Sequence, residues 1–128
     1  MRYIAAVVAL VAASQLYAQP PRIVEELTGK VVSIADGDTV TVLVNQEQIK
    51  VRLEGIDAPE SRQSFGTRSK QALSEMVFGE KVTVGKTGAD RYGRTLGMIV
   101  VDGVDVNAKM VENGWAWHYK QGSSPVPG

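Results

Sequence analysis

The chain has 128 residues, no cysteine and a single histidine, and its 14 basic residues balance its 14 acidic ones. The lack of cysteine excludes disulfides and thiolate metal sites, and one histidine leaves a structural zinc site without enough ligands. A formal charge of zero means that a nucleic-acid partner would have to be held by local basic groups, since no net field attracts it. The length predicts one small domain.

The first residues have the pattern of a secretory signal peptide. Met1-Arg2 is a basic start, residues 4–13 are an apolar run, and residues 14–18 form a cleavage region that ends at Ala18. The apolar run is too short for a stable membrane anchor. We therefore expect a signal peptide over residues 1–18, a secreted or periplasmic protein, and no membrane association after cleavage. A buried N-terminal helix is the alternative.

The next part of the chain reads as three antiparallel strands. Residues 19–27 are a polar, proline-bearing stretch, predicted to be a flexible lead. Alternating or β-branched apolar residues then predict strands that are separated by turn-forming residues, at 28–34, 39–44 and 49–54. The short connections, Asp36 to Asp38 and Asn45 to Glu47, predict a meander.

The pattern changes after Pro59. Apolar residues at helical spacing predict a helix over 64–78 that stops at Gly79. Two more strands are expected at 81–85 and 94–101, with a loop at 87–93 between them. A turn at 102–103 and a short helix at 106–113 follow. Residues 121–128 read as a disordered tail. The expected fold class is mostly β with α, a five-stranded OB-fold barrel with two short helices. Another small antiparallel barrel is the alternative architecture.

Three short motifs carry the candidate chemistry: Asp36-Gly-Asp-Thr39, Arg52 with Asp57-Ala-Pro-Glu60, and Asp90-Arg-Tyr-Gly-Arg94. Each one alone is also an ordinary solvated turn. The second motif places one guanidinium and two carboxylates on constrained backbone, because proline restricts both its own residue and the one before it. Arginine suits an oxyanion, and carboxylates suit a cation and a water, so the group favours phosphate chemistry with a metal.

In this order on a five-stranded barrel, the motifs resemble those of the thermonuclease (staphylococcal nuclease-like) family. The likeness runs from about Thr28 to Lys120 and includes the Asp102-Gly103 turn and Val106-Asn107. It implies an OB-fold, calcium-dependent endonuclease that hydrolyses phosphodiester bonds of DNA and RNA and leaves 3′-phosphates. It also implies a monomer that binds single-stranded DNA and RNA.

The resemblance assigns roles to matching positions. Asp38, Asp57 and the Ala58 carbonyl match the calcium ligands, and Asp36 matches a position close to the metal that is not a direct ligand. The family often has threonine in place of Ala58, which keeps the carbonyl and loses a hydroxyl. Glu60 matches the residue assigned as general base, or as the group that orients the attacking water.

Basic and aromatic residues complete the implied site. Arg52 and Arg94 match the two arginines that contact the scissile phosphate. Arg91 and Tyr92 match positions near the terminal phosphate of the substrate. Trp117 and Tyr119 match the positions at which the family places aromatic residues beside a base of the substrate. Packing at the barrel edge is their alternative role.

The sequence departs from the family pattern after Lys120. Members of the family commonly continue into a third helix, whereas this sequence continues Gln-Gly-Ser-Ser-Pro-Val-Pro-Gly. We therefore expect a barrel that lacks the usual C-terminal third helix, either as a naturally short form or because the gene is truncated.

Two other functions compete with the nuclease. A catalytically silent barrel of the same family would bind oligonucleotides or a protein partner without cutting. A calcium-responsive structural domain would need the carboxylates but not Arg52 and Arg94. The presence of both arginines together with Asp38, Asp57 and Glu60 favours the nuclease.

Overall fold

The computed structural model describes residues 21–119. The predicted signal peptide, the predicted tail over 121–128 and the question of a third helix after Lys120 lie outside the described residues. Within them, no helix is long and apolar enough to cross a membrane.

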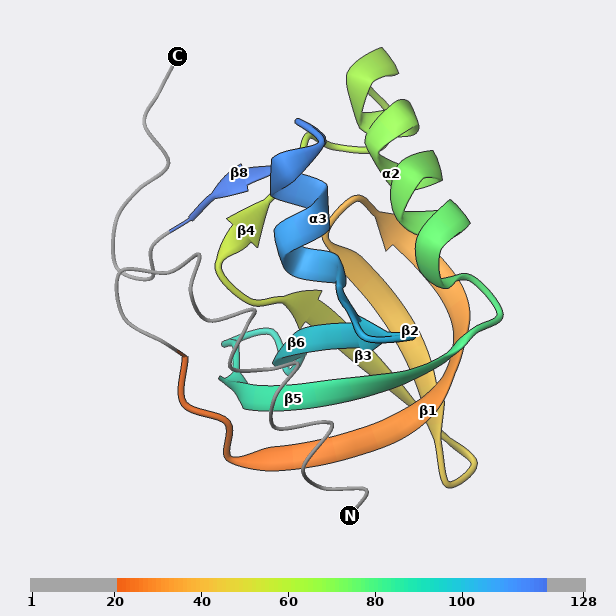
Figure 1. Ribbon diagram of the computed structural model, residues 1–128, viewed down its shortest axis with the longest axis vertical. Coiled ribbons are helices and arrows are strands. Elements are labelled where there is room, and N and C mark those ends of the chain that lie inside the picture. Colours follow the sequence, from red (N-terminus) through yellow and green to blue (C-terminus); the bar gives the residue numbers. More distant parts are fainter. Residues whose placement is uncertain (1–20, 120–128) are drawn as a thin grey trace.

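Five strands form a closed barrel, as Figure 1 shows. Their bounds are β1 (Glu25–Asp36), β2 (Thr39–Val44), β3 (Glu47–Leu53), β5 (Lys81–Ala89) and β6 (Thr95–Val101). Neighbouring strands pair in the order β3-β2-β1-β5-β6, and a parallel pairing of β3 with β6 closes the ring. Closure leaves no exposed barrel edge.

Two helices and three very short strands complete the fold. The helices are α2 (Ser64–Val77) and α3 (Val106–Glu112), and the short strands are β4 (Ile56–Asp57), β7 (Val104–Asp105) and β8 (Trp117–His118). The helix α2 packs on β1, α3 packs on β6, and the helices touch each other. The predicted class, mostly β with a five-stranded barrel and two helices, is confirmed for the described residues.

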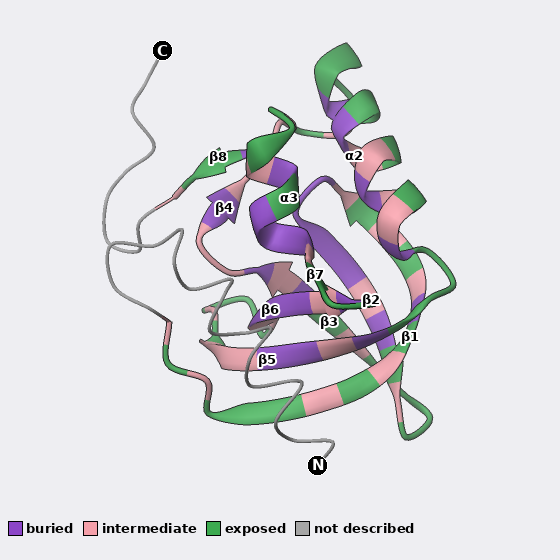
Figure 2. Ribbon diagram, in the orientation of Figure 1, coloured by how far each residue is buried: buried purple, intermediate pink, exposed green. Residues whose placement is uncertain are grey.

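The core fills the barrel interior and extends beneath both helices (Figure 2). It is built mainly from β-branched residues of the strands, whose side chains alternate between the inner and outer faces. In β3, for example, Val51 and Leu53 are buried and Arg52 between them faces the other way. Full burial of such a side chain contributes about 1.5–3 kcal/mol. The alternation therefore fixes which side of β3 presents the arginine.

The β2–β3 connection is a two-residue hairpin. Its residues Asn45 and Gln46 both have positive φ, 49° and 69°, as a type I′ turn requires. Asp102 and Gly103 have φ of 49° and 76° and join β6 to β7 in the same manner. Both turns lie where the sequence predicts them.

Several boundaries differ from the expectation, most clearly those of β1 and β5. Strand β1 begins at Glu25, so the last residues of the predicted flexible lead pair with β5. Strand β5 runs to Ala89, and the predicted loop over 87–93 is shortened to residues 90–94. The register shifts between Lys86 and Gly88, and this irregularity breaks the simple alternation on which the prediction depended.

The sequence also does not predict the pairing of β4 with β8. It joins Ile56 to His118 and Asp57 to Trp117. Strands of two residues carry almost no periodic signal, so sequence reading alone does not reveal them.

Candidate active site

Strand β3 presents Arg52, whose guanidinium lies at the centre of a group of acceptors. Its Nη1 atom donates to the carbonyl oxygen of Ile56 at 2.7 Å and to that of Leu53 at 3.2 Å. The Nη2 atom donates to Asp57 Oδ1 at 3.1 Å, and Nη1 lies 3.5 Å from Asp38 Oδ2. The side chain is 15% exposed, so the guanidinium is held in one orientation with one edge toward the carboxylates.

The turn between β1 and β2 delivers Asp38 to the same place. Thr39 is paired with Arg52 across the sheet, and the backbone N–H of Leu53 donates to the Asp38 carbonyl at 2.8 Å. The Asp38 carboxylate accepts from Thr39 Oγ1 and from the Ala58 N–H, both at 2.9 Å. These bonds fasten two of the predicted motifs together through one carboxylate.

Two glycines allow the site turns to close against α2. A Cβ atom at Gly37 would overlap the hydroxyl of Ser69 and crowd the Ala58 side chain. A Cβ atom at Gly66 would overlap the carbonyl oxygen of Glu60. Ser69 is fully buried, and its Oγ donates to the Trp115 carbonyl at 2.8 Å. The helix thus supports both turns from behind.

The carboxylates of this cluster influence one another. Burial raises the pKa of Asp36 to about 7, and the hydrogen bond and negative charge of Asp38 add to the effect. Burial also raises the pKa of Asp57. The Arg52 charge opposes this rise, whereas the hydrogen bond and negative charge of Asp38 add to it. Burial opposes ionisation of Asp38 too, but hydrogen bonds from Asp36, Ala58 and Thr39 and the Arg52 charge hold its pKa below the ordinary value.

The donor chemistry of the cluster fits a hard divalent cation. Asp36, Asp38 and Asp57 interact electrostatically, and Arg52 is the cation that faces Asp38 and Asp57 in the structure. Calcium takes six to eight oxygen ligands, including carbonyls and water, so two carboxylates can form part of such a shell. No group of three or more potential ligand side chains within residues 21–119 is arranged as a metal site. Within the cluster, Arg52 supplies positive charge to Asp38 and Asp57.

The loop before β6 folds around the Asp90 carboxylate. Asp90 Oδ1 accepts from the backbone N–H groups of Tyr92 and Arg94, each at 2.9 Å, and Oδ2 accepts from Arg94 Nε at 2.7 Å. Although partial burial acts in the opposite direction, these bonds and the Arg94 charge hold the pKa of Asp90 below its ordinary value. Because Nε is engaged, the terminal nitrogens of Arg94 carry its remaining N–H donors.

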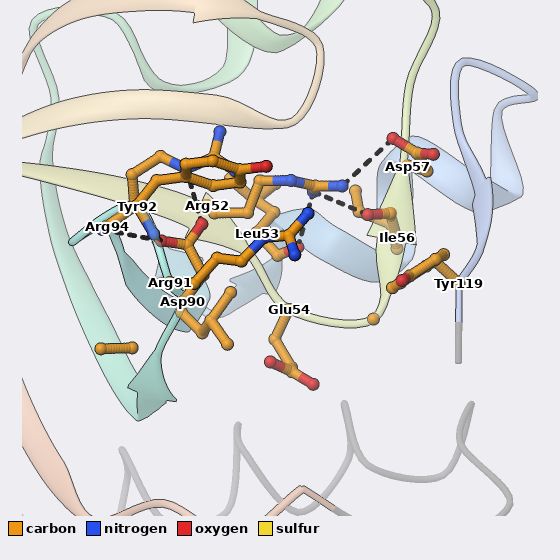
Figure 3. A pocket seen from close by; sticks show the side chains of 13 residues that line it. Arg52, Leu53, Glu54, Ile56, Asp57, Asp90, Arg91, Tyr92, Arg94 and Tyr119 are labelled. Carbon is orange, nitrogen blue, oxygen red and sulfur yellow. Dashed lines mark hydrogen bonds and ion pairs between the residues drawn. The ribbon is translucent and has the colours of Figure 1, made fainter. Parts of the chain in front are cut away.

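A pocket of about 610 Å³ brings the β3–β4 motif and this loop together (Figure 3). Six of the residues predicted for the site line it: Arg52, Asp57, Arg91, Tyr92, Arg94 and Tyr119. The guanidinium carbons of Arg91 and Arg94 lie 5.1 and 5.6 Å from the centroid of the Tyr92 ring, within the range of a cation–π contact. Figure 3 shows the Tyr92 loop and Tyr119 on opposite sides of Arg52. A pocket of this size can hold a small ligand.

The remaining predicted residues lie outside the pocket lining. Asp38 does not line the pocket but contacts Arg52, which does, and the Ala58 N–H donates to Asp38. The Glu60 carboxylate is exposed and accepts from Arg62 Nε at 3.0 Å. Trp117 is 46% exposed and sits opposite Asp57 in the β4–β8 pair. Their predicted roles remain predictions.

Glu54 and its partner Thr87 were not predicted as site residues. Glu54 lines the pocket, and the Thr87 hydroxyl donates to its Oε2 at 2.9 Å. A signal for Glu54 was present, because the strand predicted over 49–54 places it two residues from Arg52 and therefore on the same face. Thr87 carries no such signal, because it sits at the register shift of β5.

Buried Asn107 supports this wall of the pocket from inside the fold. Its Nδ2 donates to the carbonyl oxygens of Glu54 and Gly97 at 3.0 and 3.1 Å, and its Oδ1 accepts from the Ile99 N–H at 3.1 Å. The side chain is completely buried. It therefore ties α3 to the end of β3 and to β6.

Comparison with known proteins gives a consistent picture. The family model described as Staphylococcal nuclease homologue matches residues 50–126. The chain is 46% identical over 129 residues to "Protein ParB" of Escherichia coli, covering 94% of this chain and 69% of that protein. It is 40% identical to "Micrococcal nuclease" of Shigella flexneri, covering 98% and 74%, and 47% identical to an "Uncharacterized endonuclease" of Haemophilus influenzae, covering 76% and 55%.

The family match includes the second and third motifs, which contribute Arg52, Asp57, Arg91, Tyr92 and Arg94 to the pocket lining. The first two relatives also cover the Asp36–Thr39 turn, since they extend over nearly the whole chain. The closed barrel, the pocket and the extent of these matches lead to one conclusion: the chain belongs to the staphylococcal nuclease homologue family.

Proposed function

We propose that this protein is a nuclease that hydrolyses phosphodiester bonds of nucleic acids. The observation that supports this function best is the pocket, which is lined by Arg52 and Arg94 from different parts of the chain. Arg52 also contacts the carboxylates of Asp38 and Asp57. A planar guanidinium can bridge two phosphate oxygens, and two of them can oppose the charge that develops as water adds to phosphorus. The nuclease names of two relatives support the same activity.

Calcium is the proposed cofactor, held by Asp38, Asp57 and the Ala58 carbonyl. When bound, it would act as a Lewis acid on a phosphate oxygen. The chain's own contribution is to fix both carboxylates: Asp38 through Thr39 and the Ala58 N–H, and Asp57 through its place in β4. Oxygen donors of this kind suit calcium or magnesium, so the choice between them belongs to the proposal.

Glu60 is proposed to orient the attacking water. To do so, its side chain must turn from Arg62 toward the pocket. The two partners are 67% and 86% exposed, and an ion pair between such exposed groups contributes about 0–1 kcal/mol. Turning away therefore costs little, whereas the backbone of the turn stays fixed by the contact between the Glu60 carbonyl and Gly66.

Tyr92, Tyr119 and Trp117 are proposed to contact the nucleotides. Tyr92 and Tyr119 line the pocket, and the guanidinium groups of Arg91 and Arg94 contact the Tyr92 ring. Stacking on an aromatic ring contributes about 1–3 kcal/mol per base and tolerates any base, which suits DNA and RNA alike. Single-stranded substrates are expected because their bases can unstack to reach such rings.

Cleavage assays on the mature form, from Gln19 onward, test this proposal. Single-stranded DNA and RNA would be incubated with calcium, with magnesium and with chelator, and products resolved by length. We expect cleavage with calcium, none with chelator, and a loss of about 10²–10³ in rate for Arg94→Ala. Arg68→Ala is the matched control, since Arg68 is exposed on α2 and lies outside the pocket lining. A folded protein that cleaves neither polymer in either metal would refute the nuclease.

A silent oligonucleotide-binding barrel is the second candidate. It is favoured by the engagement of Arg52 with two carbonyls and two carboxylates, and by the position of Glu60 outside the pocket. Binding of labelled oligonucleotide without cleavage, lost in Arg94→Ala, would support it over the nuclease.

We further propose that the protein is exported, cleaved after Ala18 and monomeric. The support is the basic start and short apolar run of residues 1–18. Mass spectrometry of the protein recovered from periplasm and medium would find the mature N-terminus at Gln19. Recovery of the uncleaved chain from the cytoplasm alone would contradict export, and sedimentation analysis would measure the oligomeric state.

A further inference from the structure

Three lysines lie on the outer surface of the barrel. Lys30 on β1, Lys50 on β3 and Lys81 on β5 are exposed, and the valine that follows each of them is buried. Because successive side chains of a strand point to opposite faces, the three lysines face outward from the barrel. None of the ion pairs within residues 21–119 includes one of them. Within the described part of the chain, their charges are therefore available to an anion from outside.

Lys50 extends the basic lining of the pocket onto this outer surface. It is two residues from Arg52 in β3, so the two side chains share one face of the strand and their Cα atoms are about 6.5 Å apart. Arg52 lines the pocket, and Lys50 lies outside its lining. A polyanion with one phosphate at Arg52 therefore meets a second basic residue where it leaves the pocket.

The strand register places hydroxyl groups beside Lys50 and leads on to Lys30. Thr41 is opposite Lys50 in the β2–β3 pairing, and Ser33 is opposite Thr41 in the β1–β2 pairing. Lys30 lies on the same face, because its partner in β2, Leu43, is two residues from Thr41. The surface thus combines amino and hydroxyl donors, which are the side-chain groups that bind phosphate oxygens in nucleic-acid complexes.

Lys30 and Lys81 form a pair whose arrangement does not serve stability. They are directly opposite each other in the antiparallel pairing of β1 with β5. Side chains in such a position have Cβ atoms about 4.5–5.5 Å apart, and like charges there are destabilising. An anion bound between the two amino groups would remove this repulsion.

We propose that this basic face, made of Lys30, Lys50, Lys81 and the hydroxyl groups of Ser33 and Thr41, binds the phosphate backbone of nucleotides that flank the one in the pocket. The proposal rests on the proposed nuclease function. Contacts to phosphates position a strand without reading its sequence. They also supply locally the attraction that a chain of zero net charge does not exert as a whole. Long single strands should therefore bind more tightly than those that fill the pocket alone.

The salt dependence of binding, measured in chelator so that cleavage does not interfere, tests this inference. Fluorescence anisotropy would follow a labelled trinucleotide and a labelled twenty-nucleotide oligo-dT. For single strands, log K falls against log salt with a slope of about 0.7 per neutralised phosphate. The triple lysine variant, Lys30→Gln with Lys50→Gln and Lys81→Gln, should lower the slope for the long strand by about 2. Between 50 and 200 mM salt the wild type should thus lose about 20-fold more affinity than the variant, whereas the trinucleotide should bind both proteins alike.

A matched triple variant separates the basic face from the effect of net charge. Three positive charges are removed from the helices instead, by Arg68→Gln, Lys70→Gln and Lys109→Gln, and the wild-type slope should remain. Circular dichroism would check that both triple variants are folded. If the triple lysine variant does not fold, Lys50→Gln alone should still lower the slope by about 0.7.

A cleavage assay in calcium distinguishes this inference from the nuclease proposal. For the long strand, the triple lysine variant should have a raised KM with kcat unchanged, and for the trinucleotide both constants should equal those of the wild type. A folded protein that cuts neither substrate, but whose tighter binding of the long strand depends on the lysines, would support the basic face although the nuclease proposal fails. Equal salt slopes in the wild type and the triple lysine variant, or an equal fall in both triple variants, would overturn the inference even if the protein is a nuclease.

Discussion

Replacing Arg52 by alanine should destabilise the protein in chelator and make it respond more strongly to calcium. The guanidinium faces two carboxylates that are 7% and 27% exposed, and it supplies N–H donors to two backbone carbonyls. Removing one partner of a buried ion pair costs about 3–5 kcal/mol. Asp57 is partly exposed and can recover some hydration, so a loss of about 3 kcal/mol, at the lower end of that range, is expected.

Calcium should offset part of this loss. In the wild type a cation at Asp38 and Asp57 must share them with Arg52, whereas in Arg52→Ala the two carboxylates are available to it. A ligand that binds the folded state stabilises it by RT ln(1 + [L]/Kd). The variant should therefore gain more unfolding free energy from calcium than the wild type does, while its cleavage rate falls by about 10²–10³.

Urea unfolding followed by circular dichroism, with chelator and across a calcium series, measures both effects. Arg62→Ala is the control, because its ion pair with Glu60 is exposed and should contribute under about 1 kcal/mol. Wild-type stability of Arg52→Ala in chelator, or equal stabilisation of both proteins by calcium, would refute the view that Arg52 and the cation compete for the same carboxylates.

Three further predictions concern stability. The pKa of Asp36 is raised from 3.8 to about 7, so the stability that its proton contributes is present below about pH 4 and is lost as the pH rises through about 7. Asp36→Asn should therefore flatten the fall in Tm between pH 5 and 8, measured in chelator. An unchanged slope would contradict the assignment. Asn107→Ala removes the bonds to the Glu54 carbonyl and the Ile99 N–H, at about 1–3 kcal/mol each, while the Gly97 carbonyl keeps its bond from the Glu54 N–H. Denaturant unfolding should therefore show a loss of about 2 kcal/mol or more, and one under 1 kcal/mol would be inconsistent with it. Gly66→Ala should cost about 1–3 kcal/mol in the same assay because its Cβ overlaps the Glu60 carbonyl, whereas Gly88→Ala, where the Cβ enters open space, should change little; equal effects would argue against the packing of α2 on the site turn.

Much of the fold follows from local sequence pattern. The alternation of Val40, Val42 and Val44 and the helical spacing that leads to Leu73 and Val77 predict elements that the structure confirms within a few residues. The barrel closure, β3 against β6, is a parallel pairing between distant segments, and it followed from the number and order of the strands rather than from any local signal. The family resemblance is confirmed by the family-model match.

The site was predicted less completely than the fold. Motif spacing identified Arg52, Asp57 and Arg94, because turns and strand ends constrain what lies near them. It did not reveal that Arg52 already holds Asp38 and Asp57, since side-chain pairing depends on three-dimensional approach. Thr87 was assigned to a loop because a bulge is invisible to a period-two pattern.

The β4–β8 pair determines when the pocket can form. Tyr119 lines the pocket, its N–H donates to the Gly55 carbonyl at 2.7 Å, and β8 brings Trp117 opposite Asp57. These contacts join segments about sixty residues apart, so the pocket is complete only after a long intervening loop has been closed. A chain still emerging from the ribosome can build barrel hairpins, but it has no finished pocket beside the messenger RNA that encodes it. The topology itself thus delays the appearance of a nucleic-acid-cutting site until the rest of the domain is in place.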